Sequence, residues 1–240
     1  MRTFAVVVAV GVVGALGAAT TFVTAAPGLT VETLARWGPD VLWAVETERE
    51  IVALTIDDGP SARTDEILDV LEARGAEATF FLVGERVADR PDVVDRIVAR
   101  GHEIGNHTMV EEPSIRMSES RFRASLARTD ALLARWGDPE WFRPGSGWFD
   151  GEMLEIARSH GYRTALASML PVDGWVPWPP LVARYVLASA RPGAVLVLHD
   201  GPDRAGTTLE ILRRVLPELE RRGYEVTTVS ELAGAATAAR

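Results

Sequence analysis

Two adjacent acidic residues, Asp57 and Asp58, follow directly on an apolar run over residues 51–56. The run is mostly β-branched or apolar, which predicts a buried strand, and Gly59 and Pro60 turn the chain immediately after the two acids. Neighbouring carboxylates repel each other, so neither ionises comfortably without a nearby cation or metal ion. A solvated pair that opens a loop is the alternative interpretation.

A second polar cluster is residues 101–113, GHEIGNHTMVEEP. His107 and Glu111 are four residues apart, and a single helical turn would place both side chains on one face, as a chelating pair requires. An isolated pair of this kind is more often a surface ion pair. Together with a strand-end aspartate it forms a mixed N/O triad suited to Zn²⁺ or another divalent ion. His102 lies at the other end of its strand and is predicted to be structural.

Arg143 and His199 extend the set of candidate residues. Arg143 lies between an aromatic strand and a glycine-rich turn, where it could hold a carboxylate ionised while the turn exposes N–H groups to an oxyanion. An ordinary surface arginine is the alternative. His199 ends an apolar strand, and with Asp173 to hydrogen-bond one ring nitrogen it becomes a candidate proton donor. Trp175 is either a core or lid residue or an exposed indole that stacks on sugar rings.

The segments that carry these residues alternate between helix and strand. A recurring joint, in which a helix ends in a cation and a glycine precedes a short strand, occurs at Arg74-Gly75, Arg100-Gly101, His160-Gly161 and Arg222-Gly223, with Arg191-Pro192-Gly193 as a variant. The cation favours the helix dipole and the glycine supplies a left-handed cap. The alternation predicts an α/β fold with a parallel sheet and covering helices.

Six or seven such units in roughly 190 residues favour a distorted (β/α) barrel over a complete eightfold one, with an open doubly wound sheet as the alternative. In both folds, reactive side chains gather at the C-terminal ends of the strands. Further helices are predicted from Pro91 and from Ser118 to Trp136, and Pro217 is expected to kink or split the last helix.

Composition excludes several classes of protein. The 240 residues carry a net charge of −9, and 47% are hydrophobic, which suits one globular domain and argues against a nucleic-acid partner. There is no cysteine, so any metal must be held by His, Asp or Glu. Residues 1–26 are apolar after one arginine, which predicts a signal peptide or a single membrane anchor and an extracytoplasmic location for the rest. No feature of the sequence indicates an oligomeric state.

In order and spacing, these segments resemble the polysaccharide deacetylases, the NodB-homology group of carbohydrate esterase family 4. The resemblance covers about residues 41–232 and is carried by TIDDGP at 55–60, by residues 101–108 and by LVLH at 196–199. It implies a distorted (β/α)7 barrel within a catalytic domain over residues 27–240. It also implies metal-dependent removal of acetyl groups from an N-acetylated, or O-acetylated, glycan such as peptidoglycan or chitin-like oligomers.

By matching position, the resemblance implies a role for each candidate. Asp57 would be the general base with Arg143 as its partner, and His199 the general acid held by Asp173. A backbone N–H near Ser146 could stabilise the oxyanion. Trp175 is assigned with Ser146 to substrate binding.

The metal ligands implied in the same way are Asp58 and His107, with Glu111 where the family usually has a second histidine. An anionic ligand in that place lowers the charge of the site and shifts its preference toward harder ions. Zn²⁺ is the expected ion, with Co²⁺, Mn²⁺ and Ni²⁺ as alternatives. Two other functions stay open: a deacylase for a small or lipid-linked N-acyl sugar, and a non-catalytic glycan-binding relative, which Glu111 favours.

Overall fold

The computed structural model describes residues 41–169, 173, 176 and 178–237. The predicted signal peptide or anchor over residues 1–26 and the candidate Trp175 lie outside these residues. Among the helices in the described part of the chain, none is long and apolar enough to span a membrane.

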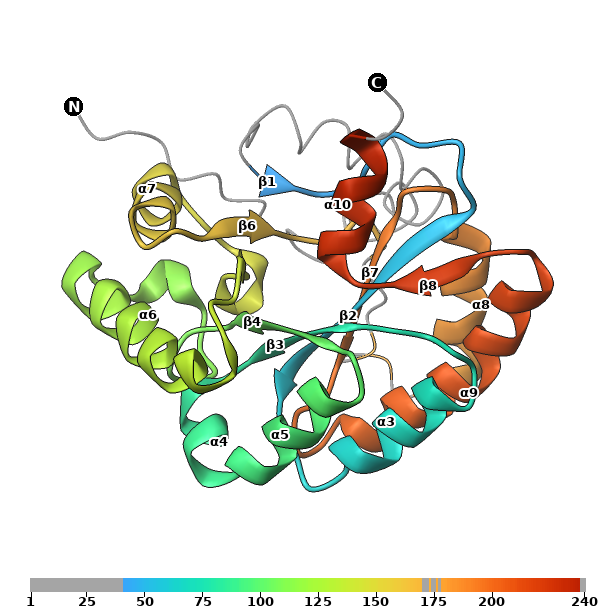
Figure 1. Cartoon of the computed structure of the whole chain (residues 1–240), viewed down its shortest axis with the longest axis horizontal. Helices are drawn as coiled ribbons and strands as arrows, with labels where there is room; N and C mark the ends of the chain where they lie inside the picture. Colours follow the sequence, from blue (N-terminus) through green and yellow to red (C-terminus); the bar gives the residue numbers. More distant parts are fainter. Residues whose placement is uncertain (1–40, 170–172, 174–175, 177, 238–240) are drawn as a thin grey trace, which may run out of the picture.

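Eight strands and eleven α-helical or 3₁₀ segments alternate along most of the described chain (Figure 1). The strands are β1 Val41–Leu42, β2 Ile51–Gly59, β3 Thr79–Leu82, β4 Glu103–Asn106, β5 Trp141–Phe142, β6 Arg163–Ala165, β7 Val195–His199 and β8 Glu225–Thr227. The α-helices are α3 Thr64–Glu72, α4 Gly84–Asp89, α5 Pro91–Ala99, α6 Glu119–Leu133, α7 Gly151–Ser159, α8 Pro179–Ser189, α9 Ala205–Arg221 and α10 Val229–Thr237. Among the 3₁₀ turns, η1 is Ser114–Arg116 and η3 is Gly145–Gly147.

The strands form one parallel sheet in the order β1-β6-β5-β4-β3-β2-β7, and β8 pairs with the start of β2. Two isolated bridges, Ala44 to Ala194 and Met169 to Leu196, join the β1–β6 end of the sheet to the β7 end. The sheet therefore curves back on itself, and the helices lie around it (Figure 1). The expected α/β barrel is confirmed in this distorted form, and the open doubly wound alternative is not.

Side-chain alternation along β2 explains how the barrel is filled. Val52, Leu54 and Ile56 point outward into the large core beneath the helices. Ile51 and Ala53 point inward and join an interior cluster that α10 completes from the start of the strands. Because successive side chains alternate faces, the next inward position beyond Thr55 is Asp57. The interior is therefore apolar at one end and polar at the C-terminal end of the strands.

The predicted joints between helices and strands are confirmed. All five joint glycines have positive φ, from 57° at Gly75 to 87° at Gly161. Pro217 does not split its helix, because α9 continues through it to Arg221, and α10 rather than α9 is the last helix. Buried leucines on both sides of the proline, including Leu212, Leu216 and Leu219, keep that helix packed against the core.

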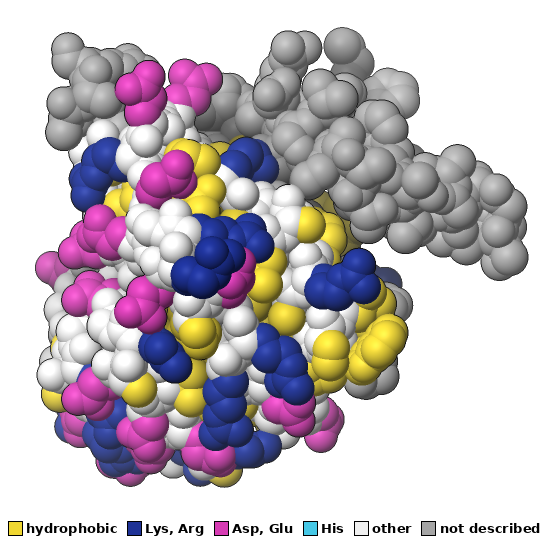
Figure 2. All heavy atoms as spheres, turned by 90° about the vertical axis from the view of Figure 1, so that its right-hand side faces the viewer, with side chains coloured by type: hydrophobic (Ala, Val, Ile, Leu, Met, Phe, Trp, Pro, Cys, Tyr) yellow, Lys and Arg dark blue, Asp and Glu magenta, His cyan; other side chains and the backbone are white. Residues whose placement is uncertain are grey.

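The outer surface on the right-hand side of Figure 1 carries α8 and α9. Figure 2 shows arginine and acidic side chains interspersed over this face, so neither sign forms a continuous field across the described residues in view. Short-range ion pairs such as Arg221 with Glu218 at 2.6 Å account for part of this pattern. Exposed pairs of this kind contribute little to stability.

Candidate active site

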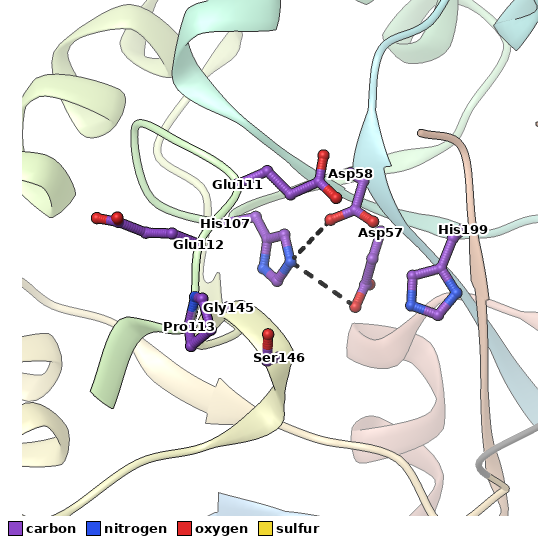
Figure 3. Close-up of a pocket in the computed structure, with 9 residues that line it drawn as sticks. All are labelled: Asp57, Asp58, His107, Glu111, Glu112, Pro113, Gly145, Ser146 and His199. Atoms are coloured by element: carbon purple, nitrogen blue, oxygen red, sulfur yellow. Dashed lines mark ion pairs between the residues drawn. The ribbon is translucent and has the colours of Figure 1, made fainter. Parts of the chain in front are cut away.

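A pocket of about 230 Å³ opens at the C-terminal ends of the strands, where the sequence predicted the chemistry. Its lining residues come from β2, β7 and the loops after β4 and β5 (Figure 3). They are Asp57, Asp58, His107, Glu111, Glu112, Pro113, Gly145, Ser146 and His199. Six of the predicted site residues thus line one cavity. Two more, Arg143 and Asp173, hydrogen-bond to the lining residues Asp57 and His199.

Arg143 is the partner of Asp57, as predicted from the resemblance. Its Nη1 donates to Asp57 Oδ1 at 2.7 Å and to Thr55 Oγ1 at 2.6 Å. The other guanidinium nitrogens donate to the carbonyls of Ala165 and Leu166, and Phe81 stacks beneath the group at 4.1 Å. Arg143 is only 3% exposed and Asp57 5%, so each charge depends on the other for compensation.

Asp58 and His107 face each other across the pocket. His107 Nδ1 donates to the Arg143 carbonyl at 2.8 Å, because a carbonyl can only accept, and this leaves Nε2 directed at Asp58 Oδ1, 3.4 Å away. Burial alone would raise the pKa of Asp58, but the hydrogen bond and charge of His107 outweigh it and lower the pKa to about 2. Burial also opposes protonation of His107, yet the two aspartates raise its pKa overall.

This geometry fits a divalent ion at two of the three predicted ligands. Two donors about 2.0–2.2 Å from one tetrahedral ion lie about 3.3–3.6 Å apart, and the Asp58–His107 separation of 3.4 Å falls in that range. Glu111 lines the same pocket, but its Oε2 is paired with Arg86. Within the described residues no group of three or more His, Cys, Asp or Glu side chains is arranged to hold a metal. The role of Glu111 as third ligand stays a prediction.

The loop from His107 to Glu111 is not the helical turn that the four-residue spacing suggested. Thr108 adopts a left-handed conformation with φ 66°, which ends any helical path. Asn106 stabilises it, since its Oδ1 accepts from the Thr108 N–H at 2.9 Å while Nδ2 donates to Tyr162 and the Leu126 carbonyl. Local side-chain to backbone hydrogen bonds of this kind favour turns over helix. The prediction of a shared helical face was wrong, although both side chains still reach the pocket.

His199 and Asp173 form the predicted pair. Nδ1 of His199 lies 2.9 Å from Asp173 Oδ2 and 3.0 Å from Oδ1, so it donates to the carboxylate and Nε2 is left for the pocket. Burial lowers the pKa of His199, but the hydrogen bond and charge of Asp173, with smaller contributions from Asp57 and Asp58, raise it overall. The ring therefore stays protonated, and able to donate, to higher pH than an ordinary histidine.

Substitution of the histidine's partner should move the pH profile of any reaction in which His199 is the proton donor. In Asp173→Asn the pKa of His199 falls, so the alkaline limb of kcat against pH is expected to shift down by about 1 unit or more. The control is Asp203→Asn, which removes an exposed acid four residues from His199 and should leave the limb in place. An unshifted limb in Asp173→Asn would exclude His199 as the titrating acid.

Ser146 lies in the η3 turn with φ 62°, and its N–H makes no hydrogen bond within the described part of the chain. The amide is therefore available to an oxyanion, and that role stays a prediction. The neighbouring Gly145 is required by a close approach, because a Cβ there would lie 2.1 Å from the Glu112 carbonyl oxygen. His102 is structural as expected, buried against Phe80 with Nδ1 accepting from the Ala78 N–H.

Three residues at the site were not predicted. Arg86 and Arg204 approach Asp58, and Arg204 Nη1 lies 3.7 Å from Asp58 Oδ2. Buried Asp200 supports the turn after β2 by accepting from the hydroxyls of Ser61 and Thr64 at 2.7 and 2.5 Å. Asp200 directly follows His199, and that adjacency was the only signal for it in the sequence.

Comparison with known proteins places this fold and site in one family. Residues 44–165 match the polysaccharide deacetylase family. Over 196 residues the chain is 36% identical to a peptidoglycan-N-acetylglucosamine deacetylase of Bacillus cereus, covering 80% of this chain and 92% of the relative. The chain therefore belongs to the polysaccharide deacetylase family of hydrolases, which confirms the resemblance seen in its motifs.

Solved structures that share this fold include both enzymes and a pseudoenzyme. A peptidoglycan N-acetylglucosamine deacetylase in complex with 4-naphthalen-1-yl-N-oxidanyl-benzamide aligns with TM-score 0.76 and 30% identity over 80% of this chain and 92% of that one. A family 4 acetyl xylan esterase from Clostridium thermocellum, in complex with a cobalt ion, aligns with TM-score 0.70 and 32% identity over 76% and 89%. A pseudoenzyme of the same family from Bacillus anthracis aligns with TM-score 0.74 and 26% identity over 80% and 68%.

Proposed function

We propose that this chain is a metal-dependent deacetylase that hydrolyses the acetamido group of N-acetylglucosamine units in an extracytoplasmic glycan. The observation that carries the proposal is the placement of Asp57, paired with Arg143, beside the point where Asp58 and His107 approach to 3.4 Å. The peptidoglycan deacetylase among its relatives supports a glycan of the peptidoglycan or chitin-oligomer class and a location outside the cytoplasm.

Asp58 and His107 would hold the ion, with Glu111 joining them once it leaves Arg86. A divalent ion there would supply Lewis-acid activation of a water molecule and of the acyl oxygen. Zn²⁺ suits a mixed N/O set, and the carboxylate of Glu111 makes Co²⁺ or Mn²⁺ stronger competitors than a second imidazole would. The cobalt ion in the related acetyl xylan esterase supports a divalent metal of this kind.

The chain's own residues supply the proton transfers. Asp57 accepts a proton from the attacking water, and Arg143 keeps its carboxylate ionised for that purpose. The free N–H of Ser146 stabilises the negative charge that develops on the acyl oxygen. His199 then donates its proton to the amine nitrogen as the C–N bond breaks, which releases acetate and a free amine.

A non-catalytic glycan-binding function is the second candidate. The Arg86–Glu111 ion pair favours it, because Glu111 is thereby engaged away from any metal, and a pseudoenzyme is among the related structures. The base, the acid and both partner residues favour catalysis, since binding alone requires none of them.

Acetate release separates the two functions. Metal-loaded protein is expected to release acetate from chitin oligomers or peptidoglycan, and dialysis against a chelator should reduce the rate by at least about 100-fold. Readdition of Zn²⁺ or Co²⁺ should restore it. Acetylated xylan and a lipid-linked N-acyl glucosamine complete the panel, so that preference for either reassigns the substrate. Binding of the oligomers without release of acetate from any of them would support the non-catalytic function.

A further inference from the structure

Each acidic side chain that lines the pocket has an arginine of its own. Asp57 pairs with Arg143 at 2.7 Å and Glu112 with Arg121 at 2.7 Å, while Asp58 has Arg204 at 3.7 Å. Glu111 pairs with Arg86. Within the described residues, each carboxylate that lines the pocket therefore lies within ion-pair distance of an arginine.

Arg86 differs from the other arginines because it connects both segments that carry predicted metal ligands. Its Nη1 donates to the backbone carbonyl of Asp58, and its Nη2 pairs with Glu111 Oε2. Asp58 has φ 66°, a left-handed conformation that few non-glycine residues adopt. A bidentate guanidinium of this kind fixes the relative position of the two groups it contacts.

The position of Arg86 is itself fixed by the fold. The first two amides of α4 donate to the loop that carries Glu111, from Gly84 to the Thr108 carbonyl at 2.9 Å and from Glu85 to the Met109 carbonyl at 3.0 Å. The Arg86 side chain is 18% exposed, whereas that of Glu111 is 41% exposed. Glu111 is thus the more exposed partner of the pair, and Arg86 the more buried one.

We infer that Arg86 is a positioning residue that competes with the metal for Glu111. This inference rests on the proposed function. When the site holds a metal ion, Glu111 leaves Arg86 and binds the ion. Because that exchange breaks the ion pair between Arg86 and Glu111, the presence of Arg86 weakens metal binding. Neutral histidine in the same place could form no such pair with an arginine, so the competition follows from the acid at position 111.

Metal titration calorimetry on the metal-free chain, with Zn²⁺ and with Co²⁺, tests the inference. Arg86→Gln is expected to lower the Kd by about tenfold, since it frees Glu111 to bind the ion. Arg121→Gln is the matched control, because it removes an equal charge from Glu112, the neighbouring pocket acid that is not a predicted ligand, and it should change the Kd by less than about threefold. Arg86→Met, which also removes the charge that pairs with Glu111, serves if the glutamine variant does not fold and should lower the Kd as well.

The double variant shows whether Arg86 acts through Glu111. In a Glu111→Ala background, Arg86→Gln should gain no more affinity for the metal than Arg121→Gln does. The visible absorption of bound Co²⁺ should differ between the wild type and Glu111→Ala. If metal binding is measurable and Arg86→Gln leaves the Kd unchanged or raises it, the inference about Arg86 is overturned. The proposed function would not be affected by that result. Absence of binding in every variant would instead remove the metal site on which the proposed function rests.

Discussion

Replacement of Asp57 by asparagine is expected to lower kcat for acetate release by about 10²–10⁴-fold while metal content stays at the wild-type level. Asparagine keeps the shape and one hydrogen-bond acceptor for Arg143 but cannot take a proton from water. Asp57 Oδ2 lies 4.0 Å from His107 Nε2, beyond the 3.4 Å at which Asp58 approaches the same atom, so the loss should fall on proton transfer rather than on metal binding.

Steady-state release of acetate, with metal content measured on the same samples, checks this expectation. Asp92→Asn is the control, because Asp92 pairs with Arg96 on the exposed side of α5 and its loss should leave kcat unchanged. If Asp57→Asn kept more than about a tenth of the activity at full metal occupancy, the general base would have to be another residue.

Removal of the Arg143 guanidinium is expected to have the largest effect on folding. Arg143→Met leaves Asp57 buried without a counter-charge and the carbonyls of Ala165 and Leu166 without their donors. Breaking a buried ion pair from one side costs about 3–5 kcal/mol of the free energy of unfolding. Activity should be lost as well, because the base is no longer held ionised.

Denaturant titration of Arg143→Met beside Arg163→Met measures the difference. Arg163 also stacks on an aromatic ring, that of Trp141 at 4.2 Å, and pairs with Glu140, but more than half of its side chain is exposed. Its loss should cost no more than about 1 kcal/mol. Equal losses in the two variants would show that the buried network around Asp57 contributes no special stability.

The strand ends could be predicted from sequence because they follow from local pattern and general geometry. An apolar run that stops at Asp57, or at His199, marks the end of a buried strand, and parallel strands bring such ends together without further information. The positions of the joint glycines were equally predictable, since a left-handed cap favours a residue without a side chain. The barrel and the placement of most candidate site residues are consequences of these two signals.

The environment of Glu111 could not be predicted in the same way. The conformation of its loop depends on Thr108, a β-branched residue with φ 66° that is held by the side chain of Asn106. Its partner Arg86 lies twenty-five residues earlier, on helix α4, and an arginine near a strand end carries no signal of which carboxylate it will meet. Pairing of charges across loops is decided by tertiary structure, which local periodicity does not encode.

Acetate release by the metal-loaded chain from an N-acetylated chitin oligomer or from peptidoglycan is the measurement that bears most directly on the proposed function. The site predicts release by the wild type that is lost in Asp57→Asn when both proteins hold the same amount of metal. Full metal occupancy in the wild type without acetate release from either glycan would contradict it, and the chain would then be a glycan-binding member of the family.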